Sequence, residues 1–267
     1  MKRSVGAELE ITAGTQSEVE LQVAVARTPG LKVRERLTVV HDDHGPLTPT
    51  EIATPHHGRL HLLTVPPGRT RVSYDATVRR TARPAEVDQV DLSTYRRPSR
   101  YATADTFGDV AEAEFGTVAD RDLLQAVSSW VGTRLEYVPG SSGPTDGAAD
   151  TLEHRAGVCR DYAHLGIALL RALGVPARLV AVYAPGCFPM DFHAVVEAYV
   201  AGGWHVVDST ALAPRSSLVR IATGRDAADT AFMTTTNGDA DLESSAVTAV
   251  VDGSLPSDDL DRLVQIG

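Results

Sequence analysis

Apolar and polar residues alternate with a period of two along several stretches in the first third of the chain. The pattern covers residues 19–25, 32–40, 59–65 and 71–78, and Pro/Gly pairs that favour turns separate these stretches. Successive side chains of a β-strand point to opposite faces of its sheet, so this alternation is typical of half-buried strands. Short strands without a helical period between them predict an all-β, sandwich-like domain over residues 1–90.

A helical period replaces the alternation in the middle of the chain. Apolar residues three and four apart predict one helix over residues 120–136 and another over residues 158–173, which Gly174 and Pro176 end. Further strands are predicted at residues 177–183, 192–200, 204–208 and 244–251. We therefore expect an α+β domain over residues 91–267, with a linker at its start and an acidic tail at its end.

Composition narrows the class of protein. The chain has 267 residues, of which 43% are hydrophobic and 22% charged, as in ordinary globular proteins. Its net charge is −10, and no basic stripe with interleaved aromatic residues occurs, so we expect no nucleic-acid partner. No apolar run is long enough to span a bilayer, and Glu8 interrupts any signal-peptide core, so we expect no membrane partner and a cytoplasmic protein. The sequence favours no particular oligomeric state.

The chain has two cysteines, Cys159 and Cys187, and both are expected to be free thiols. Two cysteines do not make a thiolate zinc site by themselves. The histidines of the first domain are interpreted as surface residues in or beside turns, so no metal and no cofactor are expected; they are His41, His44, His56, His57 and His61.

Cys159 lies at the predicted start of the second helix, directly after Gly157 and Val158. Free N–H groups and the positive end of the helix dipole favour an anion there, which favours a thiolate. The same N–H groups are able to donate to an oxyanion that develops on a substrate carbonyl. The alternative is a small buried cysteine that only fills space.

His193 and Asp208 lie on two strands that the turn Ala201-Gly202-Gly203 joins. With the turn centred between Ala201 and Gly202, His193 faces position 210, and Asp208 is its diagonal neighbour on the same sheet face, or lies directly opposite if the turn is shorter. A carboxylate at this position would fix the imidazole tautomer and stabilise the imidazolium. A helix-start cysteine, a strand histidine and an adjacent-strand aspartate together predict an acyl-transfer site.

The segments Gly157-Val158-Cys159-Arg160-Asp161-Tyr162-Ala163-His164-Leu165, Asp191-Phe192-His193-Ala194 and Trp204-His205-Val206-Val207-Asp208-Ser209-Thr210 resemble the bacterial transglutaminase-like family. The resemblance implies a papain-like core, with a helix-borne cysteine packed on an antiparallel sheet after a β-rich N-terminal domain. It also implies that Cys159 is the nucleophile, His193 the general base and acid, and Asp208 the orienting carboxylate. Many relatives carry tryptophan where this chain has Val195, and Asp-Pro-Thr where it has Asp208-Ser209-Thr210.

The predicted activity is thiol acyl transfer: cleavage or transamidation of a peptide or isopeptide amide in a peptide or protein substrate. Hydrolysis is favoured because water needs no dedicated acceptor site. Two alternatives stay open, a catalytically idle peptide-binding cleft and a scaffold that acts through the N-terminal domain. Candidate substrate-cleft residues are Tyr137, Phe188 and Met190, whereas His164 and Asp161 are expected to be structural.

Overall fold

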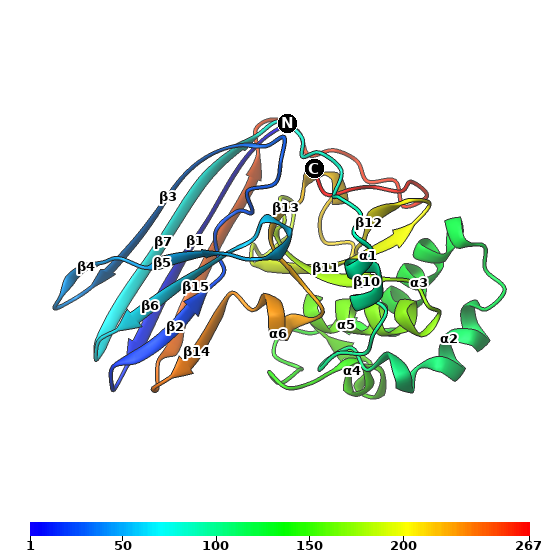
Figure 1. The fold of residues 1–267 in the computed structure, drawn as a ribbon, viewed down its shortest axis with the longest axis horizontal. Coiled ribbons are helices and arrows are strands. Elements are labelled where there is room, and N and C mark those ends of the chain that lie inside the picture. Colours follow the sequence, from blue (N-terminus) through cyan, green and yellow to red (C-terminus); the bar gives the residue numbers. More distant parts are fainter.

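Two antiparallel β-sheets packed face to face form one half of the molecule, and helices around a third sheet form the other half (Figure 1). The computed structural model describes the backbone of residues 1–267 and every side chain except those of residues 120 and 121. The first sheet has the order β15 (Asp241–Val251), β1 (Lys2–Ala13), β7 (Gly68–Arg79), β3 (Lys32–His41) and β4 (Gly45–Leu47). The second has the order β14 (Met233–Asn237), β2 (Ser17–Leu21), β6 (Arg59–Val65) and β5 (Thr50–Ala53). Their inner faces enclose one apolar core, which confirms the predicted sandwich.

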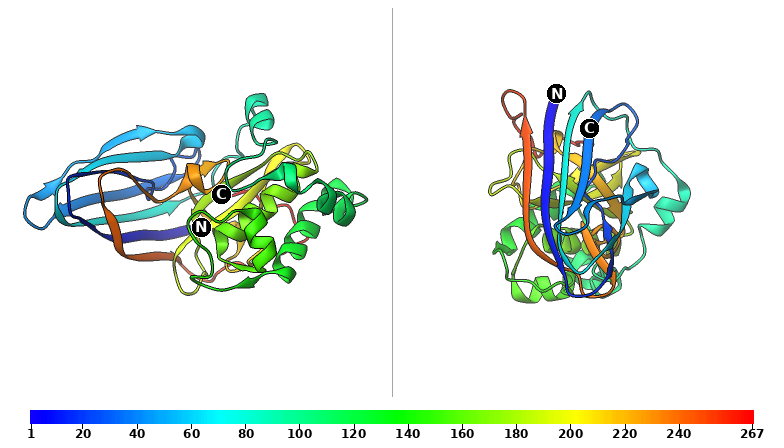
Figure 2. Two further views of the ribbon diagram at one scale, coloured as in Figure 1. Left: turned by 90° about the horizontal axis from the view of Figure 1, so that it is seen from below. Right: turned by 90° about the vertical axis from the view of Figure 1, so that its left-hand side faces the viewer.

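Strands from both ends of the chain complete this sandwich. β1, which the sequence pattern did not predict, lies inside the five-stranded sheet between β7 and β15. β15 pairs with β1 and β14 pairs with β2, so the chain returns to the sandwich after residue 230 (Figure 2). The expected division into residues 1–90 and 91–267 does not assign β14 and β15 to the sandwich. The chain returns there because Val247 and Ala249 on β15 bury their side chains in the sandwich core.

The third sheet has the order β12 (Gly203–Val207), β11 (Phe192–Val200), β10 (Ala177–Tyr183) and β13 (Val219–Gly224). Helix α5 (Cys159–Ala172) packs on one face of it, and apolar side chains from both elements form a second core. The opposite face packs against residues that include Val264 and Ile266 of the C-terminal tail. The predicted strands over residues 177–183 and 192–200 are confirmed to the residue, and the predicted helix over residues 158–173 is confirmed to within one residue at each end.

The hairpin of β11 and β12 has the predicted register. Val196 lies opposite Val207 and Val200 opposite Gly203, so facing residue numbers sum to 403, as expected. Ala201 and Gly202 make the turn with positive φ angles of 48° and 81°. Two consecutive positive φ angles give the turn type whose twist matches that of the strands it joins. This turn fixes which residues of the two strands share a face.

Most helices lie around α5 in the half opposite the sandwich (Figure 1). Helix α3 (Asp120–Arg134) confirms the predicted helix over residues 120–136, two residues shorter at its end. The expected linker contains a helix, because Asp88 caps its first turn by accepting from the Val90 N–H and Leu92 packs near Trp204. The remaining short elements are α1 (Gln89–Thr94), α2 (Gly108–Phe115), α4 (Ala148–His154), α6 (Ala227–Thr230), η1 (Pro55–His57), η2 (Ala104–Thr106), η3 (Arg215–Ser217), β8 (Glu136–Tyr137) and β9 (Ala156–Gly157).

Buried polar contacts join the two halves. The Tyr183 hydroxyl donates to the Val23 carbonyl oxygen at 2.7 Å, and the Ala26 N–H donates to the Arg220 carbonyl at 2.9 Å. Next to this boundary, Glu197 accepts from Arg178 at 2.8 Å and from Arg220 at 2.5 Å. Burial opposes the Glu197 charge, but the two guanidinium groups outweigh it and lower the pKa of Glu197 to about 2. Among the residues that the structure describes, no helix has the length and apolar character to cross a bilayer.

Candidate active site

Cys159 is the first residue of α5, as the sequence predicts, and its side chain is half-buried. Asp161 fixes this helix start, because its fully buried carboxylate accepts from the Val158 N–H at 2.8 Å. The structural role expected for Asp161 is therefore confirmed. Gly157 is needed for space, since a Cβ at this position would lie 2.6 Å from the Cβ of Asp161. The thiol is thereby held on a rigid N-terminal turn, with Sγ 3.9 Å from the Phe192 carbonyl oxygen.

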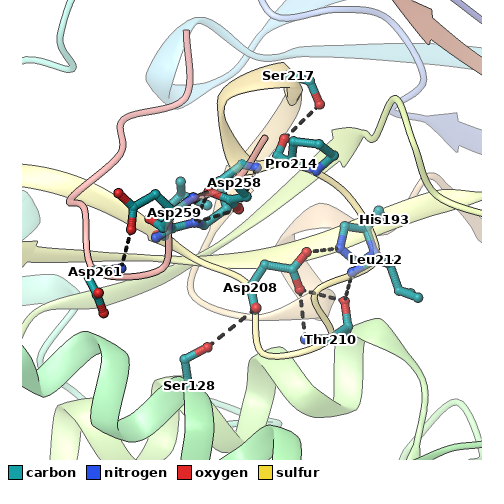
Figure 3. A network of polar contacts seen from close by, with 12 residues as sticks. Ser128, His193, Asp208, Thr210, Leu212, Pro214, Ser217, Asp258, Asp259 and Asp261 are labelled. Carbon is teal, nitrogen blue, oxygen red and sulfur yellow. Dashed lines mark hydrogen bonds and ion pairs between the residues drawn. The ribbon is translucent and has the colours of Figure 1, made fainter. Parts of the chain in front are cut away.

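His193 and Asp208 meet side chain to side chain (Figure 3), and His193 lines the same cleft as Cys159. His193 Nε2 lies 2.8 Å from Asp208 Oδ2, and the two side chains are only 1% and 2% exposed. The other carboxylate oxygen, Oδ1, accepts from the Thr210 N–H at 3.0 Å and from the Thr210 hydroxyl at 2.6 Å. Three donors thus hold the carboxylate in one orientation, and it in turn holds the imidazole. Because Nε2 is engaged, Nδ1 is the ring nitrogen left for Cys159.

Charge and burial compete at this pair. Burial disfavours the imidazolium, but the Asp208 charge, the Asp208 hydrogen bond and a hydrogen bond with the Cys159 side chain raise the pKa of His193 well above its usual value. Burial likewise disfavours the Asp208 carboxylate, but His193 and the Thr210 donors lower the pKa of Asp208. The site therefore favours an imidazolium–carboxylate pair in contact with a sulfur. An imidazolium beside a thiol stabilises the thiolate.

The cleft candidates lie in different surroundings. Tyr137 is 39% exposed and lies next to the helix start: burial and the Cys159 side chain raise the pKa of its phenol, while a hydrogen bond from the Cys159 backbone opposes the rise. Phe188 and Met190 are 88% and 42% exposed, and none of the three candidates is among the described residues that line the cleft at Cys159. Their loop turns these side chains to solvent, whereas Cys187 of the same loop is buried. Burial is also the main reason that the pKa of the Cys187 thiol is raised.

A cleft of about 530 Å³ opens beside Cys159 and His193. Its walls come from α5, from β10 and β11, and from the segment that leads through α6 into β14; among the lining residues are Tyr101, Phe192, Phe232, Met233 and Thr234. Residues 230–234 form a wall that no sequence pattern predicts, because only the pairing of β14 with β2 brings them to the site. The contacts of Thr210 with Asp208 were also not predicted, although the spacing Asp-x-Thr is a local signal for them.

His164 also lines this cleft but cannot face the sulfur from its place on α5. Its Nε2 accepts from the Ala227 N–H at 3.2 Å, and its ring stacks on Tyr101 with 5.3 Å between centroids. Burial, the largest influence, lowers the pKa of His164 to about 4, so its imidazole is neutral near pH 7. The packed, hydrogen-bonded histidine expected from the sequence is confirmed. Among the side chains that the structure describes, no three His, Cys, Asp or Glu residues group as ligands for a metal ion.

Comparison with known proteins places this arrangement in a family. The family model of the transglutaminase-like superfamily matches residues 111–209, which contain Cys159, His193 and Asp208. The crystal structure of a candidate cysteine protease from Cytophaga hutchinsonii is 32% identical, with a TM-score of 0.88, over 98% of this chain and 96% of that chain. The chain belongs to the transglutaminase-like superfamily.

Two further relatives of this transglutaminase-like chain are more distant. An uncharacterised protein of Mycobacterium leprae is 29% identical over 119 residues, which are 42% of this chain and 43% of that relative's length. The periplasmic domain of TgpA from Pseudomonas aeruginosa is 20% identical, with a TM-score of 0.40, over 78% of this chain and 90% of that one. The match to the Cytophaga hutchinsonii structure spans 98% of this chain and therefore includes the β-sandwich as well as the helical half.

Proposed function

We propose that this chain is a thiol acyl-transfer enzyme that cleaves or transamidates peptide or isopeptide amides, with Cys159 as nucleophile, His193 as general base and acid, and Asp208 as orienting carboxylate. The observation that carries the proposal is the buried 2.8 Å contact of His193 Nε2 with Asp208 Oδ2, which leaves Nδ1 for the sulfur at the start of α5. Family membership and a match to a candidate cysteine protease support it.

Acylation begins from a Cys159 thiolate beside an imidazolium. The sulfur forms a bond to the substrate carbonyl carbon, and the carbonyl π electrons move to oxygen and give a tetrahedral oxyanion. The imidazolium then donates its Nδ1 proton to the amide nitrogen as the C–N bond breaks and the amine leaves. A thioester on Cys159 and a neutral imidazole remain, and Asp208 keeps the other proton on Nε2.

The Tyr137 phenol and the start of α5 are proposed to stabilise the oxyanion. The main-chain N–H of Cys159 donates to the Tyr137 phenol oxygen, and the phenol is protonated at neutral pH. The positive end of the α5 helix dipole adds to the stabilisation. A phenol that accepts from the Cys159 backbone still has its own O–H to donate. Tyr137 is therefore proposed as an oxyanion donor.

Deacylation returns the enzyme to its starting state. The neutral imidazole removes a proton from water or from an acceptor amine, whose oxygen or nitrogen attacks the thioester carbonyl. The C–S bond then breaks, and the thiolate–imidazolium pair forms again. We propose hydrolysis as the main outcome, because water reaches the half-exposed cysteine without an acceptor site of its own.

The proposal is tested by mass spectrometry of the intact protein during turnover of a synthetic library of unstructured dodecapeptides of known sequence. We expect a covalent adduct on Cys159 equal in mass to the acyl part of a peptide, and its disappearance in the Cys159→Ser and His193→Ala variants. Addition of a primary amine distinguishes the acceptors, because transamidation adds the amine to the product whereas hydrolysis does not. No adduct and no peptide product with the folded wild-type protein would contradict the proposal.

A further inference from the structure

Strand β14 of the sandwich has an unpaired edge where it enters the proposed active-site cleft. We infer that this edge binds the substrate as an extended peptide, by adding it as a further strand beside β14 while the scissile bond lies at Cys159. The inference rests on the proposed function and names its substrate class: unfolded polypeptide segments, in preference to folded surfaces or small amides. It also assigns the N-terminal half of the molecule a part in substrate binding.

The register of β14 shows which backbone groups are free. β14 is the outer strand of its sheet and pairs with β2 on one side only, with Met233 opposite Leu21. The Phe232 carbonyl accepts from the Gln22 N–H at 2.9 Å, so Phe232 directs its hydrogen-bonding groups toward β2. Bonded and non-bonded positions alternate in an antiparallel ladder. Met233 therefore directs its N–H and C=O away from β2, toward the open edge.

A chain of contacts connects this edge with the sulfur. Cys159 Sγ lies 3.9 Å from the Phe192 carbonyl, and the Phe192 ring stacks on the Phe232 ring with 4.6 Å between centroids. Phe232 immediately precedes β14, and Met233 and Thr234 line the same cleft as Cys159. A peptide along β14 thus passes directly to the nucleophile, with the two phenylalanine rings as a surface for one of its apolar side chains.

The composition of β14 supports a pairing role. Its sequence is Met-Thr-Thr-Thr-Asn, with β-branched residues and without charge or proline. Proteins usually protect sheet edges with charges, proline or a covering segment. The other outer strands of the three large sheets are protected in these ways: Pro46 lies in β4, Glu51 in β5, and Asp241 and Glu243 in β15. The Val206 N–H of β12 donates to the Val264 carbonyl of the tail, and the Arg220 carbonyl of β13 accepts from the Ala26 N–H. β14 is left open at the cleft.

The first test uses the full chain carrying Cys159→Ala, which binds peptides without turning them over. The dodecapeptide library is passed over this protein and over two double variants that also carry Met233→Pro or Met233→Ala. Both substitutions remove the Met233 side chain, but only proline removes the outward N–H. We expect retained peptides to bind roughly 3- to 10-fold more weakly to the proline variant than to the alanine variant, as the loss of one hydrogen bond implies. Equal binding by the two, or no retention by any, would overturn the inference.

The second test leaves the protein unchanged, so it also decides the matter if the proline variant does not fold. Each backbone nitrogen of one retained peptide is methylated in turn, and binding to the Cys159→Ala protein is measured. A strand presents alternate backbone groups to its neighbour, so we expect binding to fall at every second position near β14 and to persist at the positions between. A uniform response would refute strand addition. Failure of the proposed function alone would look different, because peptides would bind with this alternation while the wild type formed no acyl-enzyme.

Discussion

Replacing Asp208 with asparagine isolates the effect of one charge, because the two side chains have nearly the same shape. In the wild type, Asp208 Oδ1 accepts two hydrogen bonds from Thr210, and an asparagine oxygen is able to accept the same two. The amide nitrogen then faces His193 Nε2 and donates to it. This holds the imidazole proton on Nδ1, the nitrogen that has to receive a proton from Cys159 or from the attacking water. The base is therefore present but in the wrong tautomer.

The size of the effect follows from burial. With side chains 1% and 2% exposed, His193 and Asp208 have no water to replace the lost charge. Asparagine holds His193 in the wrong tautomer, so general acid–base catalysis is lost. This loss predicts a fall in kcat/KM of about 10³- to 10⁴-fold. Without the Asp208 charge, burial of His193 is opposed mainly by Cys159 alone, so the pKa of His193 falls and the imidazolium is lost at lower pH. The assay is the pH profile of kcat/KM with a peptide that the wild type turns over.

The matched control is Thr210→Val, which removes one donor to the carboxylate but keeps the charge and the main-chain N–H at 3.0 Å. One lost hydrogen bond predicts a fall of roughly 10-fold at most. The reasoning would be refuted if Asp208→Asn stayed folded and within about 10-fold of the wild type, or if Thr210→Val cost as much as Asp208→Asn.

Three further predictions concern buried groups around the site. Glu197→Gln leaves two guanidinium groups short of their anion and should lower the free energy of unfolding by about 3–5 kcal/mol, measured with urea. Because the folded pKa of Glu197 is depressed to about 2, its contribution in the wild type is complete above the ordinary glutamate pKa and is lost as pH falls toward 2; the variant should lack this acid dependence. Tyr183→Phe leaves the Val23 carbonyl unpaired and should cost about 1–3 kcal/mol in the same assay. Cys187→Ser should keep kcat/KM within a few-fold of the wild type, since the buried thiol contacts no reacting atom in the proposed mechanism.

Local patterns were sufficient for the two long helices, for three of the four strands of the third sheet and for the pairing of His193 with Asp208, but not for β13 or the shorter helices. The position of Cys159 follows from the start of an amphipathic helix. The proximity of His193 and Asp208 follows from the turn at Ala201 and Gly202, which makes facing residue numbers of β11 and β12 sum to 403. Both signals lie within a few residues of the groups that they place. The structure accordingly brings His193 and Asp208 together as the register predicts.

Long-range pairing was beyond the reach of local patterns. β1 alternates only weakly, because small residues such as Gly6 and Ala7 occupy positions in its middle, and its burial depends on β15 from the far end of the chain. β14 has no apolar alternation at all, so nothing in its sequence predicts that it borders the cleft. Phe188 and Met190 were predicted as cleft residues because they are apolar and immediately precede the strand of His193. Both are exposed to solvent, and closeness in sequence did not place them in the lining of the cleft.

The most direct test of the account is the pH dependence of iodoacetamide alkylation at the two cysteines, followed by peptide mass spectrometry. We expect Cys159 to react fast below pH 7 in the wild type and slowly in His193→Ala, because the imidazolium that stabilises its thiolate is gone. Cys187 should react slowly in both proteins, since burial raises the pKa of its thiol. Equal slow alkylation of both cysteines, or fast alkylation of Cys159 that persists in His193→Ala, would contradict the central claim.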